Sequence, residues 1–516
     1  MGLVEDAGLE TFHTTIGCTL KQTNEILNHN LSRVTLTSEY AHAIRNNAIK
    51  IMKKFPDSLK QKWDAKFQRI KTIETELYSF IHPESDDIKM LQEDATGQLS
   101  FGDEYFKYLN GMPFVLMCIA LFKIWAVPAL AVSTPIFAWI LPYIFLKFLY
   151  KLPISQQQYT EIMKLIWAGN PFSFKKDMAG GVKLASPSTM TLRSFIQTAV
   201  MVFSFIQSLV QPVQTAMHLY KTDALLYSNG VKCIELLTIY NEMKSGCDEH
   251  NIIFQSRNSF STIYTDDPRR TIHMLLEEPE RFKILMRDFA ELEILWRISQ
   301  SSLLHEATIF ESGAPLFQVT NAFDISLGLK AVPSSVEFTG EKNHAALTGP
   351  NGGGKSSFLR SILQCAILAQ SYGIAPAEKV NLRRFAWISS GLRLQDAPGN
   401  LSMFETEVWF ASNLLRRDSV KGPGLVLYDE LFHSTNPPDG IKTAEIFLKR
   451  LWERDSVISI ISTHVFHLVE NAPNNVKKIC CKAIKNRLGK VQYKYNVEEG
   501  ICRLSSVKSI WERFSL

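Results

Sequence analysis

A glycine-rich loop near residue 350 constrains the fold of this chain more than any other feature. The octet Gly349-Pro350-Asn351-Gly352-Gly353-Gly354-Lys355-Ser356 fits the pattern G-x-x-x-x-G-K-[ST]. It follows the apolar run Ala345–Leu347 and precedes the helix-forming segment SFLRSILQCAILAQ. Glycines in such a loop let backbone N–H groups turn inward around phosphate oxygens, and the following helix N-terminus adds a favourable dipole. The pattern therefore predicts a phosphate-binding loop between a strand and a helix.

Two carboxylates follow an apolar strand further along the chain. The run LVLY precedes Asp429 and Glu430, and Asp429 lies 74 residues beyond Lys355. We expect Lys355 to neutralise the β- and γ-phosphates of a nucleotide, with Ser357 beside the loop. The hydroxyl of Ser356 and the carboxylate of Asp429 would hold Mg²⁺, and Glu430 would orient or deprotonate the attacking water. An Asp-Glu pair alone is more often a solvated loop, but its position after a buried strand favours catalysis.

A third strand ends at another candidate catalytic residue. The apolar segment Val457–Ser462 leads to Thr463 and His464. A histidine there can donate a hydrogen bond to the γ-phosphate or to the attacking water, although a strand-end histidine alone is more often structural. Together the three strand ends predict that the chain binds and hydrolyses ATP with Mg²⁺, with Lys355, Glu430 and His464 as the catalytic residues.

Strand-like and helical segments alternate from about residue 305 onward. The runs HAALTGPN, GLVLYDE and SVISIIST are typical of parallel strands, and their alternation with helices predicts a doubly wound α/β domain. Upstream, apolar residues such as Trp63, Phe67 and Ile70 recur at helical spacing. The predicted segments are an N-terminal helical region (1–111), a hydrophobic segment (112–151), a helical core or lever-like region (152–304) and an ATPase domain (305–516).

A long uncharged stretch interrupts the helical half. Ile124–Leu146 contains 23 residues without a charge, and only Lys123 separates it from the uncharged run Pro113–Phe122. About 20 helical residues cross the hydrocarbon layer, so this stretch is a transmembrane candidate. We expect a helical hairpin that turns near Ser133–Pro135, because a single span would put the first hundred residues and the ATP site on opposite sides. The alternative is a buried helical pair inside a large soluble domain.

A second weakly polar stretch covers Phe195–Met217. It contains no charge but four glutamines. Glutamine in lipid is costly without a hydrogen-bonding partner. We therefore predict that this stretch is a core helix of a soluble bundle.

Composition leaves the partners open. The net charge of +5 neither requires nor excludes nucleic acid. The stretch 471–497 carries seven lysine and arginine residues without an acid and includes Tyr493 and Tyr495, so it could contact phosphates. A solvated β-ribbon beside the ATPase core is the favoured alternative. Eight cysteines without C-x-x-C spacing indicate reduced thiols, so we expect an intracellular protein. Together with the hydrophobic segment, this predicts a membrane-associated protein with its ATPase domain on the cytosolic side.

These motifs together are similar to those of the MutS family. The glycine-rich octet resembles that family's T-G-P-N-x-x-G-K-S/T loop, and Gly373–Ala377 resembles its G-x-x-V-P-A segment. The stretch ELFHSTNPPDG, which begins at Glu430, parallels the family's E-x-G-R-G-T-S-T-x-D-G, and the later triplet S-T-H parallels its T-T-H. The resemblance spans roughly residues 305–505.

The resemblance implies an ABC-type ATPase with a composite ATP site. In the family two subunits dock head to tail, and a serine of one reaches the ATP of the other. Gly399–Glu407 resembles that signature, which implies Ser402 as the trans-acting residue. Ala331–Ser335 occupies the place of an aromatic-x-P-N-D run that cradles adenine, which implies Val332 as a nucleotide-binding residue. The implied partners are a second copy of the chain and double-stranded or structured DNA, as in mismatch repair or recombination.

The chain also departs from the family pattern. Ala331 replaces the aromatic residue that stacks on adenine, and Phe432–Ser434 interrupts the G-R-G part of the loop. No segment resembles the mismatch-reading domain. With its hydrophobic segment, the architecture is most similar to the membrane-segment-bearing MutS-like proteins of bacteria and large DNA viruses. Two functions remain open: a DNA-dependent ATPase, and a membrane-tethered ATP-driven switch whose partner is protein or lipid.

Overall fold

The chain folds into two compact units, each discontinuous in sequence. The computed structural model describes residues 2–81, 86–167, 174–176, 182–184, 192–253, 267–394, 401–417, 422–485, 491–504 and 511. The first unit comprises Met1–Lys71, Glu242–Arg257 and Ile284–Leu516, and the second comprises Thr72–Asn241 and Asn258–Lys283. The mixture of helices and sheets is compatible with the predicted α/β class. The four consecutive segments inferred from the sequence remain a prediction.

A six-stranded sheet lies at the centre of the first unit. Its strands run in the order β13-β12-β6-β11-β10-β9. In that order they span Val491–Glu499, Val476–Lys485, His344–Thr348, Val457–Ser462, Gly424–Tyr428 and Trp387–Gly391. Neighbouring strands are parallel except for β13, which is antiparallel to β12. Strands β6, β10 and β11 are buried along their whole length, as expected of parallel strands covered on both faces.

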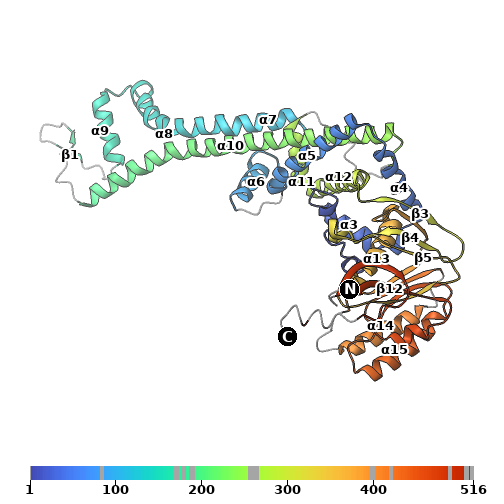
Figure 1. The fold of residues 1–516 in the computed structure, drawn as a ribbon. Helices are drawn as coiled ribbons and strands as arrows, with labels where there is room; N and C mark the ends of the chain where they lie inside the picture. The colour runs from blue at the N-terminus through green and yellow to red at the C-terminus, as the bar shows by residue number, and fades with distance from the viewer. Residues whose placement is uncertain are drawn as a thin grey trace. The chain divides into compact units, whose positions relative to one another are not determined.

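Helices cover both faces of this sheet (Figure 1). Helix α13 (Lys355–Tyr372) contacts β10 of this sheet and β3, β4, β7 and β8 of a smaller one. Helices α14 (Met403–Leu415) and α15 (Pro437–Trp452) pack on the other face through a shared apolar core that contains Val426 of β10. A mostly parallel sheet between helical layers is the arrangement of a doubly wound α/β domain.

The smaller sheet and the N-terminal helices complete the first unit. The sheet has the strand order β5-β4-β8-β3-β7. In that order its strands span Ser334–Phe338, Phe317–Ala322, Lys379–Arg383, His305–Phe310 and Ile374–Ala375. Helices α3 (Thr23–Ser32) and α4 (Glu39–Lys53) contact α13, and Nε2 of His42 lies 3.1 Å from the carbonyl oxygen of Ala369. The N-terminal residues therefore pack on the helix that follows the glycine-rich loop.

The second unit is mainly helical. It contains α6 (Asp86–Gln98), α7 (Pro113–Leu121), α8 (Val127–Ile144), α9 (Gln156–Trp167), α11 (Pro268–Glu277) and most of α10 (Leu192–Glu249). Helices α5 (Asp57–Ile81) and α12 (Pro279–Gln300) contribute to both units, and β1 (Phe174–Lys176) pairs with β2 (Val182–Leu184). Helix α11 approaches α10 at Gly230, where a Cβ would lie 2.0 Å from the Pro268 carbonyl oxygen. Arg269 then pairs with Asp223 at 2.9 Å.

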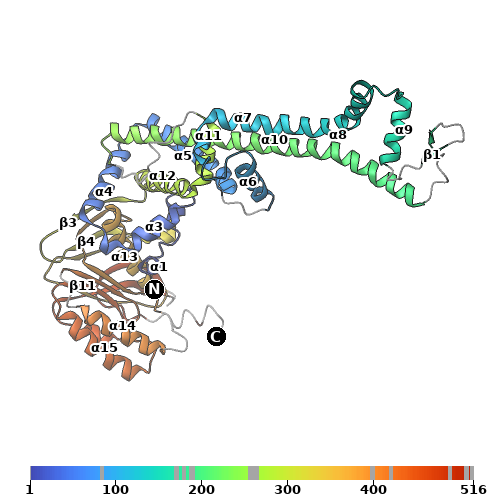
Figure 2. The same ribbon diagram turned by 180° about the vertical axis from the view of Figure 1, so that it is seen from behind.

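The hairpin predicted to turn near residues 133–135 is wrong. Two π-helical turns join α7 and α8 into one continuous helix, Pro113–Leu149. Pro135 lies inside it, and the hydroxyls of Ser133 and Thr134 each donate a hydrogen bond of 2.8 Å to the Leu130 carbonyl. One missing hydrogen bond at a proline costs less than a turn that leaves several backbone groups unpaired in an apolar segment. The first part of this helix runs beside α10 in Figures 1 and 2, and the end of α8 contacts Tyr159 of α9.

The second uncharged stretch is not the core helix that the sequence predicts. Phe195–Met217 forms the first half of α10, and its apolar side chains are exposed, with Phe203 at 65% and Met217 at 58%. A two-helix pair covers only one face of each helix, so the remaining faces stay uncovered. Of the helices in the described ranges, Pro113–Leu149 is long and apolar enough to cross a membrane, and 17% of its most apolar window is buried. That low burial contradicts a helical pair enclosed in a soluble domain.

Candidate functional site

Three loops meet at one edge of the six-stranded sheet. Strands β6, β11 and β10 are adjacent and parallel, and Leu347 of β6 pairs with Ser462 of β11. The segments that follow these strands are the glycine-rich loop, Thr463–His464 and Asp429–Glu430, and they therefore emerge together. The crevice outside the carboxyl ends of parallel strands is the usual place for a ligand in an open α/β sheet. The fold thus brings the predicted loop and carboxylates to one place.

The glycine-rich loop depends on glycine at two positions. Gly349 has a φ of 152°, and a Cβ there would lie 3.1 Å from the Cβ of Cys481 on β12. Gly354 has a φ of 98° and is the N-cap residue of α13. Glycine adopts this left-handed conformation without steric penalty. Helix α13 therefore begins directly at Lys355, with its unpaired N-terminal amides next to the loop.

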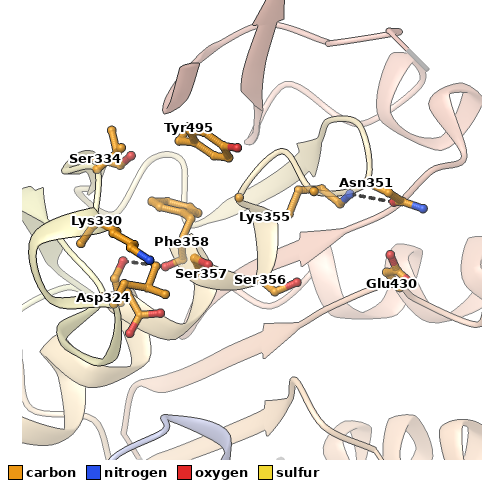
Figure 3. Close-up of a pocket in the computed structure, with 16 residues that line it drawn as sticks. Asp324, Lys330, Ser334, Asn351, Lys355, Ser356, Ser357, Phe358, Glu430 and Tyr495 are labelled. Atoms are coloured by element: carbon orange, nitrogen blue, oxygen red, sulfur yellow. Dashed lines mark hydrogen bonds between the residues drawn. The ribbon is translucent and has the colours of Figure 1, made fainter. Parts of the chain in front are cut away.

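Lys355 is only 5% exposed, and its amine is held by oxygens of the loop. Nζ donates hydrogen bonds to the carbonyl oxygens of Gly349 at 3.1 Å and Pro350 at 3.3 Å. It also donates one of 3.4 Å to Oδ1 of Asn351, which is drawn in Figure 3. A buried ammonium is stable only when it is hydrogen-bonded or paired. The loop therefore holds a positive charge at the point where its backbone turns.

Ser462 connects the two carboxylate residues. Its Oγ donates a hydrogen bond to Oδ1 of Asp429 and accepts one of 3.0 Å from the backbone N–H of Glu430. Glu430 has a left-handed φ of 53°. Such strain costs a non-glycine residue about 1–3 kcal/mol and is concentrated at functional sites. The turn separates the two side chains, because Glu430 lines the cavity beside the loop whereas Asp429 lies outside that lining.

His464 is the nearest polar neighbour of the Glu430 side chain. Its Nε2 lies 3.3 Å from Oε1 of Glu430. This hydrogen bond lowers the pKa of Glu430, and the charges of His464, Lys355 and His433 lower it further, while partial burial opposes the shift. The carboxylate is therefore ionised at neutral pH and can accept a proton or orient a water molecule. His464 itself is outside the cavity lining, so it acts on the cavity through Glu430.

The loop that follows Asp429 and Glu430 is held in place by residues of α14 and α15. Buried Glu407 of α14 accepts a hydrogen bond of 2.5 Å from Oγ of Ser434 and lies 3.1 Å from Nδ1 of His433. Phe432, with a φ of 50°, packs its ring on Phe447 of α15 at a centroid distance of 5.9 Å. The residues that interrupt the G-R-G pattern thus fix the loop to the core. Sequence reasoning treated them only as a departure.

A cavity lies beside the glycine-rich loop (Figure 3). The predicted site residues that line it are Val332, Asn351, Gly352, Gly354, Lys355, Ser356, Ser357 and Glu430. Gly349, Pro350 and Gly353 belong to the loop but not to the lining, and Asp429 and His464 lie next to Glu430. Ser402 is elsewhere: it caps α14 in a capping box with Glu405, and its side chain is exposed.

Tyr495 is a site residue that sequence reasoning did not identify. It belongs to β13, has a left-handed φ of 58° and lines the cavity with 45% of its surface exposed. A Cβ at Gly354 would lie 3.4 Å from its ring, so the ring stands over the end of the loop. Asp324 also lines the cavity, where it is buried and paired with Arg360 at 2.6 Å. The aromatic residue next to a basic run was visible in the sequence, but only as a possible phosphate contact.

The basic stretch is an edge ribbon of the main sheet. Residues 476–499 form β12 and β13, which confirms the predicted ribbon. Three of its lysines are bonded within the chain: Lys477 to the Glu337 carbonyl, Lys478 to the Glu470 carbonyl and Lys482 to the Glu498 carboxylate. Arg487 and Lys490 lie outside the described residues. These internal bonds weaken the reading of the stretch as a phosphate-binding surface.

The C-terminal part is similar to proteins of known family. Residues 345–510 match the family model of MutS domain V. The chain is 32% identical over 186 residues to the mitochondrial DNA mismatch repair protein MSH1 of Arabidopsis thaliana, which covers 36% of this chain and 16% of that protein. It is 28% identical over 171 residues to the DNA mismatch repair protein MutS of Streptococcus agalactiae serotype Ia, covering 33% and 20%, respectively. With MutS of Streptococcus thermophilus it shares 24% identity over 263 residues, covering 49% and 29%.

The similarity is confined to one part of those relatives. The chain matches less than a third of the length of each, since the largest share is 29%. The matched range 345–510 contains the glycine-rich loop, Asp429, Glu430 and His464, which the fold brings to one sheet edge. The motifs, the geometry and the family model thus agree on the same residues. Residues 345–510 of the chain therefore correspond to MutS domain V.

Proposed function

We propose that the chain binds and hydrolyses ATP with Mg²⁺ in the cavity beside the glycine-rich loop. The observation that carries this proposal is the convergence of a helix N-terminus, buried Lys355 and ionised Glu430 at one sheet edge. The positive charge of Lys355 and the helix dipole would attract the phosphates. The carboxylate of Glu430 would orient a reacting water molecule. This combination is the one that phosphoryl transfer to water requires.

The side chains at the sheet edge also fit Mg²⁺. Within the described residues there is no group of three or more His, Cys, Asp or Glu that could hold a metal alone. Mg²⁺ commonly takes one or two protein oxygens and completes its shell with substrate phosphates and water. The hydroxyl of Ser356 and the carboxylate of Asp429 are oxygens of this kind. The ion would supply charge neutralisation on the phosphates, and Ser462 would keep Asp429 oriented.

The chain's own residues divide the chemical work. Lys355 would transfer its hydrogen bonds from loop carbonyls to phosphate oxygens, which needs only a small movement of its amine. Glu430 would take the proton of the attacking water or orient that water, a role typically worth about 10²–10⁴ in rate. His464 would hold the Glu430 carboxylate and keep it ionised. The buried Glu407 would keep the following loop in place.

We assign the nucleobase to a position against Tyr495, whose ring stands over the end of the loop at Gly354. Ala331 leaves no aromatic ring where the family resemblance implies one, whereas Tyr495 brings a ring to the same cavity from β13. Val332 and Leu327 supply apolar surface nearby. Stacking of one base on an aromatic side chain is worth about 1–3 kcal/mol. The ring of Tyr495 on β13 therefore takes the place of the aromatic side chain that Ala331 does not provide.

We also propose that a second copy of the chain completes the site. Ser402 is exposed at the N-terminus of α14 and does not line the cavity of its own chain. In a head-to-tail dimer the equivalent serine of the second copy would reach the phosphates, as the family resemblance implies. A Ser402→Ala variant should then lose turnover without losing nucleotide binding. Mixing it with Glu430→Gln chains should partly restore turnover if the sites are composite.

The names of the relatives point to DNA mismatch repair, and we propose a DNA-related role for this chain. Structured or double-stranded DNA would stimulate its ATPase activity. The test is ATP turnover by the purified full chain with no DNA, with duplex, and with mismatched or branched DNA, each at two salt concentrations. A salt-sensitive stimulation supports the role, because phosphate contacts weaken as salt rises. Equal turnover in all samples contradicts it.

The exposed apolar helices favour a second candidate function. A membrane-tethered ATP-driven switch would use the same nucleotide chemistry without DNA. The observation behind it is the helix Pro113–Leu149, whose apolar surface is mostly uncovered. Turnover that depends on detergent or lipid, and that DNA does not change, would favour this candidate over the first.

A further inference from the structure

Two helices of the second unit carry uncharged, exposed surfaces that the nucleotide site does not use. We propose that α8 and the first half of α10 cross a phospholipid bilayer as an antiparallel pair. Helix α9, which lies between them in the chain, would then be on the far side of the membrane. The inference rests on the membrane-tethered candidate function and does not depend on ATP hydrolysis. It replaces the tight hairpin of the sequence prediction with two separate crossings.

Each helix contains an uncharged run long enough for one crossing. Ile124–Leu146 has 23 residues and Ser194–Tyr220 has 27 residues without Asp, Glu, Lys or Arg. About 20 helical residues span the hydrocarbon layer, so either run suffices. A cation stands at both ends of each run: Lys123 and Lys147 bound the first, and Arg193 and Lys221 bound the second.

The two runs lie side by side over part of their length. Figures 1 and 2 both show the start of α8 next to α10, with the chain running in opposite directions along the two helices, whereas the end of α8 turns away towards α9. The groove between them is lined by Ile124, Pro128 and Val132 from one helix and by Val213 and Met217 from the other. Ile124 and Lys221 line the same groove, so Lys123 and Lys221 stand at the same end of the two runs. Lysine and arginine at both ends of an apolar span reach the headgroup layers, which is the pattern of a membrane pair.

Away from the groove, and apart from the contact of Trp139 and Tyr143 with Tyr159 of α9, many apolar side chains of the two runs are exposed. Leu130 is 62% exposed on α8, and Val200 is 57% exposed on α10. A soluble partner protein would need one apolar patch with a polar rim. Here apolar side chains are exposed along both uncharged runs, which contain no charge to form such a rim. Hydrocarbon is the environment that accepts such a surface on all sides, since both helices satisfy their backbone groups internally.

Three exposed glutamines on α10 also fit this assignment. Gln207, Gln211 and Gln214 are spaced by four and three residues, so they share one helix face. In a bilayer, such amides form hydrogen bonds between neighbouring helices. A second copy of the chain, as proposed for the nucleotide site, would bring the matching face.

The first test asks whether the full chain is in the membrane. Membranes of cells that produce the chain are washed with alkaline carbonate and floated on a density gradient. We expect the chain to float after the wash and to leave the membrane only with detergent. A chain that is soluble without detergent, or that the wash removes, overturns the proposal. ATP turnover is measured on the detergent-released chain, so a failed ATPase and a failed crossing give different results.

The second test asks whether there are two crossings. Single cysteines replace exposed Gln61 in the first unit and exposed Gln157 of α9, a matched pair, in a background carrying Cys118→Ser. A membrane-impermeant maleimide should label one of the two in sealed vesicles and the other only after permeabilisation. A third reporter, Ile136→Cys, should resist labelling until the bilayer is dissolved. Labelling of both glutamine positions from the same side of sealed vesicles overturns the two-crossing arrangement.

Discussion

The sheet edge of the first unit and the helix pair of the second unit depart from ordinary burial in opposite ways. At the sheet edge, charged and polar residues such as Lys355, Glu407 and Ser462 are buried. Along the helix pair, large apolar residues such as Leu130 and Phe203 are exposed. Soluble domains avoid both situations unless something compensates.

The compensation differs between the two regions. Every buried polar group named at the sheet edge has a hydrogen-bond partner within the chain, which keeps the site rigid before substrate binds. The exposed apolar helices share one groove, and the end of α8 contacts Tyr159 of α9, but much of their apolar surface stays uncovered. In the first region the buried polar groups are therefore already paired, whereas the second region leaves apolar surface uncovered. If the two regions act independently, substitutions at the sheet edge should change ATP turnover, and substitutions on the helix pair should change membrane partition.

Replacing the carboxylate of Glu430 should affect chemistry alone. Glu430→Gln keeps the side-chain size but cannot accept a proton, so we expect kcat to fall by about 10²–10⁴ with nucleotide binding retained. Steady-state turnover and fluorescent-nucleotide binding measure the two quantities. Glu445→Gln, at an exposed position of α15, is the matched control and should leave both unchanged. Equal turnover in the two variants would show that Glu430 is not a catalytic residue.

Charges on the helix pair should affect membrane partition alone. Leu130→Lys combined with Phe203→Lys should lower the membrane-bound fraction at least tenfold, since a central lysine costs about 2.5–3.5 kcal/mol in a bilayer. Flotation gives the bound fraction, and ATP turnover of the detergent-purified variant should match that of the unmodified chain. Ile446→Lys replaces an apolar residue of similar exposure in the first unit and should not change partition. If ATP turnover falls together with the membrane-bound fraction, the helix pair and the sheet edge do not act independently.

Removing the ring at position 495 should weaken nucleotide binding by a moderate amount. Tyr495→Ala would lose base stacking of about 1–3 kcal/mol, so we expect KM for ATP to rise roughly tenfold or more with little change in kcat. Tyr495→Phe keeps the ring and should bind ATP like the unmodified chain. A similar KM in the alanine and phenylalanine variants would place the base elsewhere.

The smallest effect concerns the pH dependence of turnover. His464 is the main cause of the lowered pKa of Glu430, so His464→Ala should raise that pKa toward its ordinary value. A lowered pKa keeps the carboxylate ionised as the pH falls, and raising it lets protonation occur at a higher pH. The acidic limb of the kcat–pH profile should therefore move to higher pH in the variant. His467→Ala, at a nearby exposed histidine, is the control and should not move it. If the acidic limb of the kcat–pH profile is unchanged in both variants, His464 does not control the pKa of Glu430.

The sequence predicted which segments meet at the sheet edge because each of them is a short local pattern. The glycine-rich loop, Asp429–Glu430 and His464 each directly follow a buried strand, and parallel pairing necessarily brings such strand ends together. Tyr495 could not be found in this way. Its place over Gly354 depends on β13 pairing with β12 and on its own left-handed backbone.

The first uncharged segment shows the opposite outcome. We expected a hairpin that keeps both flanking regions on one side of a membrane, but the chain continues as one helix through Pro135. The glutamines of Phe195–Met217 suggested a buried helix, but glutamine content says nothing about which faces a neighbour covers. In both cases the sequence pattern does not show which neighbouring helix packs against each segment.

The sequence by itself determined the glycine-rich loop, the two carboxylates that follow a strand and the uncharged runs, because each is a local pattern of neighbouring residues. Only the tertiary structure decided which ring stands over the loop, how Ser462 joins Asp429 to Glu430, and which helix pairs with the first uncharged run. Contacts between distant segments depend on the burial of whole faces, and a linear pattern does not contain that information.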